Sequence, residues 1–465
     1  MRGIRAVLLS SLLLSGCSAP VDEGELDSGL MPRDSRAPGD SAALDDAEAD
    51  GSATDGCIAS SERCNGRDDD CDGIVDEDFD LRTDASHCGG CGHVCTGDTA
   101  CSDGRCANEV DGIGAGHDHS CAVLHGGSVY CWGADDGRLG RDNGLDAAPK
   151  SAAAPVAALT DAVEVAGGRA FTCARRRGGQ VTCWGRDDFG QLGNGGGAES
   201  TSAPSAVMGI TDAVKIATGS MHACALLAGG AVKCWGLGQD GRLGTGDVEN
   251  RAAPAAVAGL TDAVDLAAGE RHTCAIRLGG AVVCWGANGS GQVGDGTVIE
   301  RQTPTLTGGV MGAVELDAGS EHTCARMADG EVRCWGRGTE GQLGMGTTPD
   351  AGPAMPTSEL PPADIISAGH GNHSCAISGD TAYCWGDNTT LQVDGSGASV
   401  MRRTVPTLVA ADGPLLDLAL GGTHSCAVAN GNRVVCWGAN DDGQCGNPVS
   451  PPLSAPLDVM GLPAP

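Results

Sequence analysis

Alternating carboxylates between residues 68 and 77 are the side chains of this chain best suited to metal chemistry. Asp68, Asp70 and Asp72 stand at every second position, and Gly73 permits the sharp turn that follows such residues in calcium-binding loops. In a twelve-residue calcium-binding loop, oxygen atoms at positions one, three, five, seven and nine bind the Ca²⁺ ion. The segment therefore predicts a calcium site whose ligands are Asp68, Asp70, Asp72, the carbonyl of Ile74, Asp76 and Glu77.

The end of this loop departs from the twelve-residue pattern, because its twelfth position is Phe79 rather than Glu. Glu77 or Asp78 can supply the missing carboxylate, as in the shorter loops of thrombospondin type 3 repeats, which this segment resembles. Calcium sites in extracellular modules are weak, with Kd on the order of 10⁻⁴–10⁻³ M. The alternative is an acidic, disulfide-tied surface loop that binds no metal.

The first residues predict export. Two arginines precede an apolar run over residues 6–14, and the sequence Leu-Ser-Gly-Cys then ends at Cys17. This arrangement indicates a secretory signal peptide over residues 1–17. Its last residue resembles the cysteine of a bacterial lipobox, which implies lipidation of Cys17, and Ser18 after it favours the outer membrane. The expected location is the cell envelope; the alternative is an ordinary signal peptide with a chance cysteine.

Residues 18–56 consist mainly of Asp, Glu, Ser, Ala, Gly and Pro. Such a composition cannot bury enough apolar surface to form a core, so we predict a disordered acidic tether. The whole chain has a net charge of −32. This charge argues against nucleic acids and anionic membrane surfaces as partners, so the only membrane contact we expect is the lipid anchor.

Eight cysteines lie between Cys57 and Cys106, and His87 and His93 flank a Cys-x-x-Cys spacing among them. In a reducing compartment this pattern would indicate zinc. In a secreted chain an even number of cysteines indicates disulfides instead. We therefore predict a small disulfide-rich module over residues 57–109, with the pairing of its cysteines left open.

The tripeptide Cys-Trp-Gly occurs seven times, about fifty residues apart, and a second cysteine precedes each copy by ten residues, or by nine in the sixth copy. A repeat of this length indicates a propeller or a solenoid. With a turn between them, the two cysteines face each other across an antiparallel hairpin, within disulfide reach. We predict one disulfide per repeat: Cys121–Cys131, Cys173–Cys183, Cys224–Cys234, Cys274–Cys284, Cys324–Cys334, Cys375–Cys384 and Cys426–Cys436.

The repeated sequence Gly-x-x-His-Thr-Cys-Ala, Val-x-Cys-Trp-Gly and Gly-Gln-Leu-Gly, complete at residues 319–344, resembles the regulator of chromosome condensation repeat. The resemblance implies an all-β, seven-bladed β-propeller over residues 110–465. That family includes a chromatin-bound guanine-nucleotide exchange factor and a secreted bacterial inhibitor of β-lactamase. The predicted compartment and the acidic charge exclude a cytosolic GTPase and chromatin as partners, so we carry neither activity over. Residues 57–109 resemble modules of surface and secreted proteins of myxobacteria-like bacteria.

A proline-containing strand precedes most repeats, and residues 456–462 supply one more at the end of the chain. The first repeat begins near Val110 without such a strand. We therefore predict that the C-terminal strand joins the first blade and closes the ring. Cys445, which replaces the leucine of Gly-Gln-Leu-Gly, is expected to be a buried, inert thiol.

Departures from the repeat point to function. Six repeats carry a histidine at one position, and we favour packing within the blades over a ring of metal ligands: His119, His222, His272, His322, His373 and His424. The second repeat has a phenylalanine there, a second phenylalanine in a later loop and three arginines at its hairpin tip. Arginine and aromatic residues are frequent interface anchors, so we predict a partner-binding surface, with ordinary surface variation as the alternative. Its residues are Phe171, Arg175, Arg176, Arg177 and Phe189.

No arrangement of nucleophile, base and acid stands out from the repeat pattern. We therefore predict a non-enzymatic, monomeric surface lipoprotein whose propeller binds an extracellular or surface protein, for adhesion, recognition or sequestering of a secreted protein. The alternative is an extracytoplasmic enzyme or enzyme inhibitor that uses the mouth of the propeller. Calcium is the one expected cofactor, and no organic cofactor is expected.

Overall fold

The computed structural model describes residues 63–65, 75–76, 78–97, 99–141, 150–196, 199–349, 351–394, 400–430 and 432–464. All of them belong to one unit, Cys57–Pro465. The signal peptide and its Cys17, the acidic tether, and all the predicted calcium ligands except Asp76 lie outside the described residues; those ligands are Asp68, Asp70, Asp72, Ile74 and Glu77.

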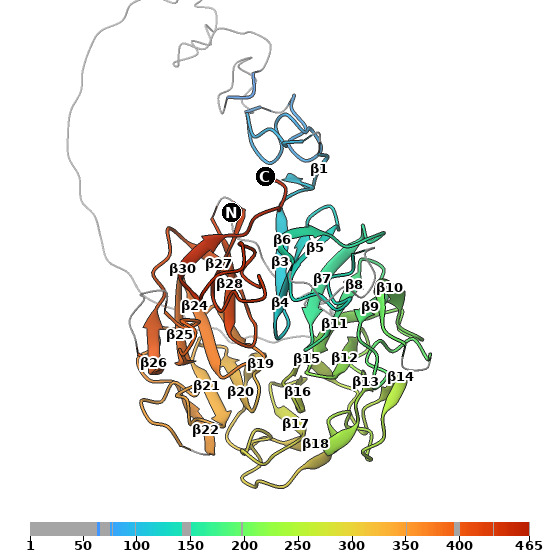
Figure 1. Cartoon of the computed structure of the whole chain (residues 1–465), viewed down its shortest axis with the longest axis vertical. Helices are drawn as coiled ribbons and strands as arrows, with labels where there is room; N and C mark the ends of the chain where they lie inside the picture. Colours follow the sequence, from blue (N-terminus) through green and yellow to red (C-terminus); the bar gives the residue numbers. More distant parts are fainter. Residues whose placement is uncertain are drawn as a thin grey trace, which may run out of the picture. The chain divides into compact units, whose positions relative to one another are not determined.

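Seven four-stranded antiparallel sheets form a ring, and each sheet consists of four consecutive strands (Figure 1). The first strands of neighbouring sheets contact one another around the whole ring, including β27 against β3. Apart from one short 3₁₀ helix, η1 (Gln239–Gly241), the regular structure of the described residues is β. The predicted all-β, seven-bladed propeller is therefore confirmed. None of the described helical segments has the length and hydropathy needed to cross a bilayer.

The blades are numbered along the chain. Blade 1 consists of β3 (Val110–Ala115), β4 (His119–Leu124), β5 (Val129–Gly133) and β6 (Lys150–Pro155), and blade 2 of β7 (Ala162–Gly167), β8 (Phe171–Arg176), β9 (Val181–Gly185) and β10 (Thr201–Ala206). Blade 3 consists of β11 (Ala213–Thr218), β12 (His222–Leu227), β13 (Val232–Gly236) and β14 (Arg251–Ala256), and blade 4 of β15 (Ala263–Ala268), β16 (His272–Arg277), β17 (Val282–Gly286) and β18 (Arg301–Leu306). Blade 5 consists of β19 (Ala313–Ala318), β20 (His322–Met327), β21 (Val332–Gly336) and β22 (Gly352–Pro356). Blade 6 consists of β23 (Ile365–Ala368), β24 (His373–Ser378), β25 (Thr381–Asp387) and β26 (Arg402–Leu408), and blade 7 of β27 (Leu415–Leu420), β28 (His424–Ala429), β29 (Arg433–Gly438) and β30 (Leu453–Asp458).

The second and third strands of every blade form the predicted disulfide-linked hairpin. In blade 3, Cys224 lies directly opposite Cys234, and the Cα atoms of all seven such pairs are 4.0 or 4.1 Å apart. In blade 6, where the spacing is nine, Ser378 pairs with Thr381 across a two-residue turn, so the cysteines still face each other. The seven predicted intrablade disulfides are confirmed.

The predicted position of the C-terminal strand is wrong. β30 pairs with β29 of blade 7, with Leu457 opposite Cys436, and does not join blade 1. Each proline-containing strand follows a Cys-Trp-Gly strand and pairs back onto it, so these strands end a blade rather than begin the next one. They are the outermost strands of the blades. Proline has no backbone N–H, so it hinders the pairing of such an edge with a further strand. Blade 7 instead meets blade 1 through side-by-side packing of β27 and β3.

The core of the propeller lies between adjacent blades. One cluster of buried side chains joins Leu226, Val232 and Leu243 of blade 3 to Leu266 and Trp285 of blade 4. All seven tryptophans are fully buried. One tryptophan and one disulfide per blade therefore fill a core that is otherwise built from small aliphatic residues.

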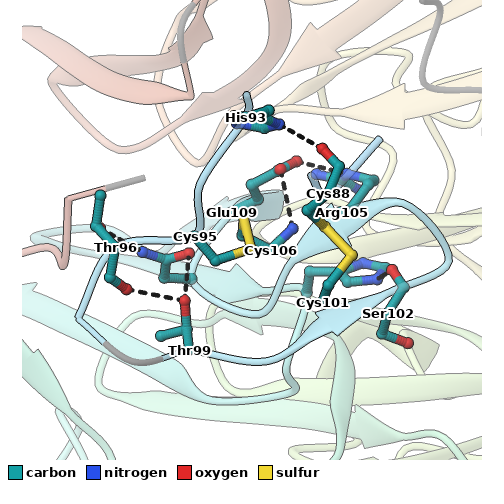
Figure 2. Close-up of a disulfide and its surroundings, with 12 residues drawn as sticks. Cys88, His93, Cys95, Thr96, Thr99, Cys101, Ser102, Arg105, Cys106 and Glu109 are labelled. Carbon is teal, nitrogen blue, oxygen red and sulfur yellow. Dashed lines mark hydrogen bonds and ion pairs between the residues drawn. A yellow bond between two sulfur atoms is a disulfide. The ribbon is translucent and has the colours of Figure 1, made fainter. Parts of the chain in front are cut away.

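The module before the propeller contains a two-stranded ribbon, β1 (Cys101–Ser102) and β2 (Arg105–Cys106), and three described disulfides, of which Figure 2 shows Cys88–Cys101 and Cys95–Cys106. These bonds join Cys64 to Cys91, Cys88 to Cys101, and Cys95 to Cys106. The sulfur atoms that a zinc ion would need are thus consumed, which favours the disulfide alternative of the sequence. Cys57 and Cys71 lie outside the described residues.

Candidate functional site

Each seam between two blades is organised by one backbone carbonyl from the Gly-Gln-Leu-Gly segment. Between blades 5 and 6, the Gln342 carbonyl oxygen accepts hydrogen bonds from Trp385 Nε1 (2.8 Å) and from the Ser374 hydroxyl (3.1 Å). An equivalent seam between blades 7 and 1 closes the ring. There the Gln444 carbonyl oxygen accepts hydrogen bonds from Trp132 Nε1 (3.0 Å) and from the Ser120 hydroxyl (3.1 Å). The repeated tryptophan and Gly-Gln-Leu-Gly segment therefore hold the ring together.

The repeated histidines belong to the same seams. Nε2 of His322 lies 2.8 Å from the Ser374 hydroxyl, which donates its own proton to the Gln342 carbonyl, so His322 must donate through Nε2. Equivalent bonds join His119, His222, His272, His373 and His424 to Thr172, Thr273, Thr323, Ser425 and Ser120. Nδ1 of all six histidines is buried without a hydrogen-bond partner.

Burial keeps these six histidines neutral. Desolvation lowers the pKa of His272, His322 and His424 to about 3 and that of His373 to about 4. It also lowers the pKa of His119 and His222 well below the usual value. Within the described residues, none of these histidines belongs to a cluster of metal-ligating side chains. They are structural residues, but the predicted contacts within each blade are wrong, because their hydrogen bonds run to the next blade.

Phe171 is also a seam residue, which corrects its assignment to a partner-binding surface. Its side chain is fully buried, and its ring lies against Gly168 as the histidine rings lie against their own glycines. The next blade carries Ala223 where the other blades carry Thr or Ser. The phenylalanine and the alanine replace a hydrogen-bonded pair by an apolar one, so this departure from the repeat serves packing.

The two ends of the blades form two faces. The hairpin face carries the tips of the disulfide-linked hairpins, and the loop face carries the long loops between the third and fourth strands. Near the hairpin face, Arg175 pairs with Glu164 (2.7 Å) and Arg176 with Asp161 (2.7 Å), while Arg177 is exposed. The half-buried Phe189 follows β9 and so lies on the loop face. The five residues predicted from the second repeat are therefore not brought together.

The hairpin face has a feature that the sequence analysis missed. At the second residue of the first strand, a β-bulge in blades 3, 4, 5 and 7 leaves an aliphatic side chain in solvent. These residues, which we call the bulge row, are Val214, Val264, Val314 and Leu416, exposed by 47, 53, 48 and 49%. Turns on the same face add the exposed Met208, Leu278 and Met311. The signal in the sequence is the pair Ala-Val, which recurs in three of these blades, but it does not show which valine faces solvent.

Two further predicted residues have defined surroundings. Asp76 of the calcium prediction is buried, and its Oδ1 accepts the Asn65 backbone N–H at 2.8 Å, so this carboxylate helps to hold the module. Calcium binding itself stays a prediction. Cys445 is a buried free thiol with Sγ 3.1 Å from the Ala439 carbonyl oxygen, and burial raises its pKa, in agreement with an inert thiol.

Comparison with known proteins agrees with the propeller fold. A model of the RCC1-like domain matches residues 85–413, and one of the regulator of chromosome condensation (RCC1) repeat matches residues 416–444. The chain belongs to the RCC1-like domain family. Two solved structures are similar in fold: Prp20p from Saccharomyces cerevisiae has a TM-score of 0.59 at 25% identity, over 68% of this chain and 81% of that one. Human WBSCR16 has a TM-score of 0.61 at 20% identity, over 69% and 87% of the two chains.

Curated relatives share shorter stretches with this RCC1-like chain. The ultraviolet-B receptor UVR8 of Arabidopsis thaliana is 36% identical over 141 residues, which are 29% of this chain and 31% of that protein. The human regulator of chromosome condensation is 32% identical over 133 residues, covering 28% and 31% of the two chains. The human E3 ubiquitin-protein ligase HERC2 is 34% identical over 174 residues, which are 34% of this chain and 4% of the ligase. The matched stretches thus span a third or less of each of these relatives.

Proposed function

We propose that this protein is a non-enzymatic, lipid-anchored surface protein whose RCC1-like propeller binds another extracellular or surface protein. The anchor would be Cys17, and the proposed location is the outer membrane, on the basis of the signal and lipobox sequence. The acidic residues 18–56 would hold the propeller away from the membrane. Adhesion, recognition and sequestering of a secreted protein all fit this arrangement.

The bulge row is the observation that carries the proposal. Large exposed apolar patches on soluble proteins mark interaction surfaces. Three of the four residues stand on consecutive blades, Val214, Val264 and Val314, at the same strand register. A partner that covers this part of the hairpin face would remove several half-exposed aliphatic side chains from water at once.

One of the similar solved propellers supports protein binding. The solved structure of Prp20p is described together with binding properties to Gsp1p and histones, and a second structure shows Kap60 bound to yeast RCC1. Those partners belong to those proteins. For this chain, the acidic charge and the predicted export favour a different protein partner, one outside the cytosol.

A capture experiment tests the proposal. The full chain, oxidised and without its lipid, is offered to surface and culture proteins of the source cell beside a variant with Val214, Val264 and Val314 changed to Ser. The matched control changes three equally exposed leucines of outermost strands: Leu306, Leu408 and Leu457. We expect one specific protein that the bulge-row variant loses and the control keeps. Equal capture by both variants, or turnover of a small substrate without a protein partner, would contradict the proposal.

We also propose calcium as a ligand of the module, through the predicted set of residues between Asp68 and Glu77. The alternating carboxylates support this proposal. Titration of the full chain with Ca²⁺, beside a variant with Asp70 changed to Asn, tests it by calorimetry.

A further inference from the structure

Blade 6 lacks a large side chain that the other blades bury at the start of their third strand. Two residues before the cysteine of Cys-Trp-Gly, six blades carry a buried valine: Val129, Val181, Val232, Val282, Val332 and Val434. Blade 6 has Ala382 at this position, opposite Ile377. The position adjoins the hairpin tip, so the aliphatic atoms that blade 6 lacks are missing from the core near the hairpin face.

The connection from blade 6 to blade 7 lacks a second large side chain. The five other connections between blades, and the segment after β30, each place one large aliphatic residue in or against a core cluster: Leu159, Ile210, Leu260, Val310, Leu360 and Leu462. In the connection after blade 6 the residue packed against the core is Ala411, and the next residue, Asp412, is exposed. Ala382 and Ala411 belong to the same cluster, so the two alanines leave one common space.

The backbone around the two alanines keeps the arrangement of the other blades. The Val409 N–H donates to the Ala382 carbonyl (3.0 Å) and the Leu415 N–H to the Asp380 carbonyl (3.1 Å), and blade 3 has the equivalent bonds at 2.9 Å. The missing atoms therefore leave a pocket, which has a volume of about 220 Å³. Its walls belong to the hairpin tip of blade 6 and to the connection, so it opens on the hairpin face. We call it the blade 6 pocket.

The walls of the blade 6 pocket are apolar, and its rim is acidic. Six of the nine lining residues are aliphatic, and three of these are buried: Ala382, Val409 and Leu415. The rim carries two exposed carboxylates, that of the lining residue Asp380 and that of Asp412, which lies between two lining residues. Apolar walls accept an aliphatic group, and the two carboxylates favour a cationic group beside it.

We propose that the blade 6 pocket receives an aliphatic side chain of the partner protein, about the size of leucine, and that a lysine or arginine stands next to it in the partner. The partner would fill the space that the other six blades fill with residues of their own. The pocket adjoins the bulge row, because Leu416, which follows the lining residue Leu415, is 49% exposed and belongs to that row. The proposal rests on the function proposed above and names one anchor of its partner.

Peptides test the pocket without the natural partner. The full chain carries ¹³C-labelled methyl groups on leucine and valine, so Val409 and Leu415 report on the pocket by NMR. The probe is acetyl-Gly-Leu-Lys-Gly-amide; acetyl-Gly-Ala-Lys-Gly-amide is its truncated control, and 1-hexanol stands for a free acyl chain. We expect a saturable shift of both signals with the leucine peptide, with Kd on the order of 1 mM, and binding of the alanine peptide at least about tenfold weaker. Equal responses to the two peptides, or a response to 1-hexanol alone, would overturn the proposal.

Two variants fill the pocket with the chain's own atoms. Ala382→Val restores the residue of the other six blades, and Ala411→Leu restores the large side chain of the connection. Each should weaken binding of the leucine peptide at least about tenfold and raise the melting temperature by about 1–3 °C, because filling a cavity stabilises the folded chain. Ala258→Leu is the matched control, since Leu260 already fills the core there, and should change the affinity less than about twofold. Unchanged peptide binding in both filled variants, or a lower melting temperature in both, would contradict the proposal.

Capture from the surface and culture proteins of the source cell separates this proposal from the proposed function. The parent chain should capture one protein, and a chain with both Ala382→Val and Ala411→Leu should capture at least about tenfold less of it. Equal capture would overturn the pocket as an anchor of the partner. No capture by the parent chain, together with a response to the leucine peptide, would overturn the proposed function and support the pocket.

Discussion

The neutral histidines of the seams make the stability of the propeller depend on pH in a way that can be calculated. The pKa of His272 is lowered from an ordinary 6.5 to about 3 by burial. Between these values the unfolded chain binds a proton that the folded chain does not, so the free energy of unfolding falls as the pH falls. From pH 8 to pH 5 the loss is about 2 kcal/mol for one such histidine. The four histidines whose pKa is lowered to about 3 or 4 together lose about 8 kcal/mol, so we expect the propeller to be much less stable at pH 5 than at pH 8.

A double substitution tests this reasoning, and blade 2 supplies its design. His272→Phe with Thr323→Ala copies the apolar pair formed by Phe171 and Ala223, and Trp335 still donates to the Gln292 carbonyl (2.9 Å). Urea unfolding, followed by tryptophan fluorescence at pH 8 and pH 5, should show a pH-dependent loss smaller by about 2 kcal/mol than in the parent chain. An unchanged pH dependence would refute the assignment of His272 as a neutral seam residue.

Three further predictions concern packing, the free thiol and the metal. Gly269→Ala should cost more than about 3 kcal/mol in thermal or urea unfolding, since a Cβ there would lie 2.3 Å from His272 Cε1, whereas Gly289→Ala, with nothing within 4 Å, should be neutral. Cys445 should react with a thiol reagent only when the chain unfolds, because its sulfur is buried and its pKa is raised; rapid reaction of the folded chain would contradict this. Calcium removal by a chelator should lower the melting temperature of the parent module but not that of an Asp70→Asn variant, and equal shifts would count against the predicted loop.

The fold was predictable because its strongest signals are local. The spacing of the two cysteines determines the hairpin register, and the compensating change in blade 6 shows that the register, not the loop length, is kept. Which strand of the repeat begins a blade cannot be determined from local sequence. Residues 456–462 fit equally well as the first strand of a blade or as the last, and only the pairing of Leu457 with Cys436 decides between them.

The roles of the site residues were less predictable, because a role can depend on a partner residue in the neighbouring blade. Phe171 looked like a surface anchor in its own repeat, but it accompanies Ala223 in the next blade. The solvent exposure of Val264 depends on a β-bulge that the alternation of side chains does not encode.

Site-specific photo-cross-linking tests protein binding by the hairpin face most directly. A photoreactive side chain is placed at Val264 of the bulge row and, in a second chain, at Ile299 on the loop face, which is 60% exposed. Exposure of source cells to each chain, followed by mass spectrometry, should give one cross-linked protein from position 264 and not from position 299. Cross-linking of the same protein from 299 alone, or of none from either position, would contradict the account.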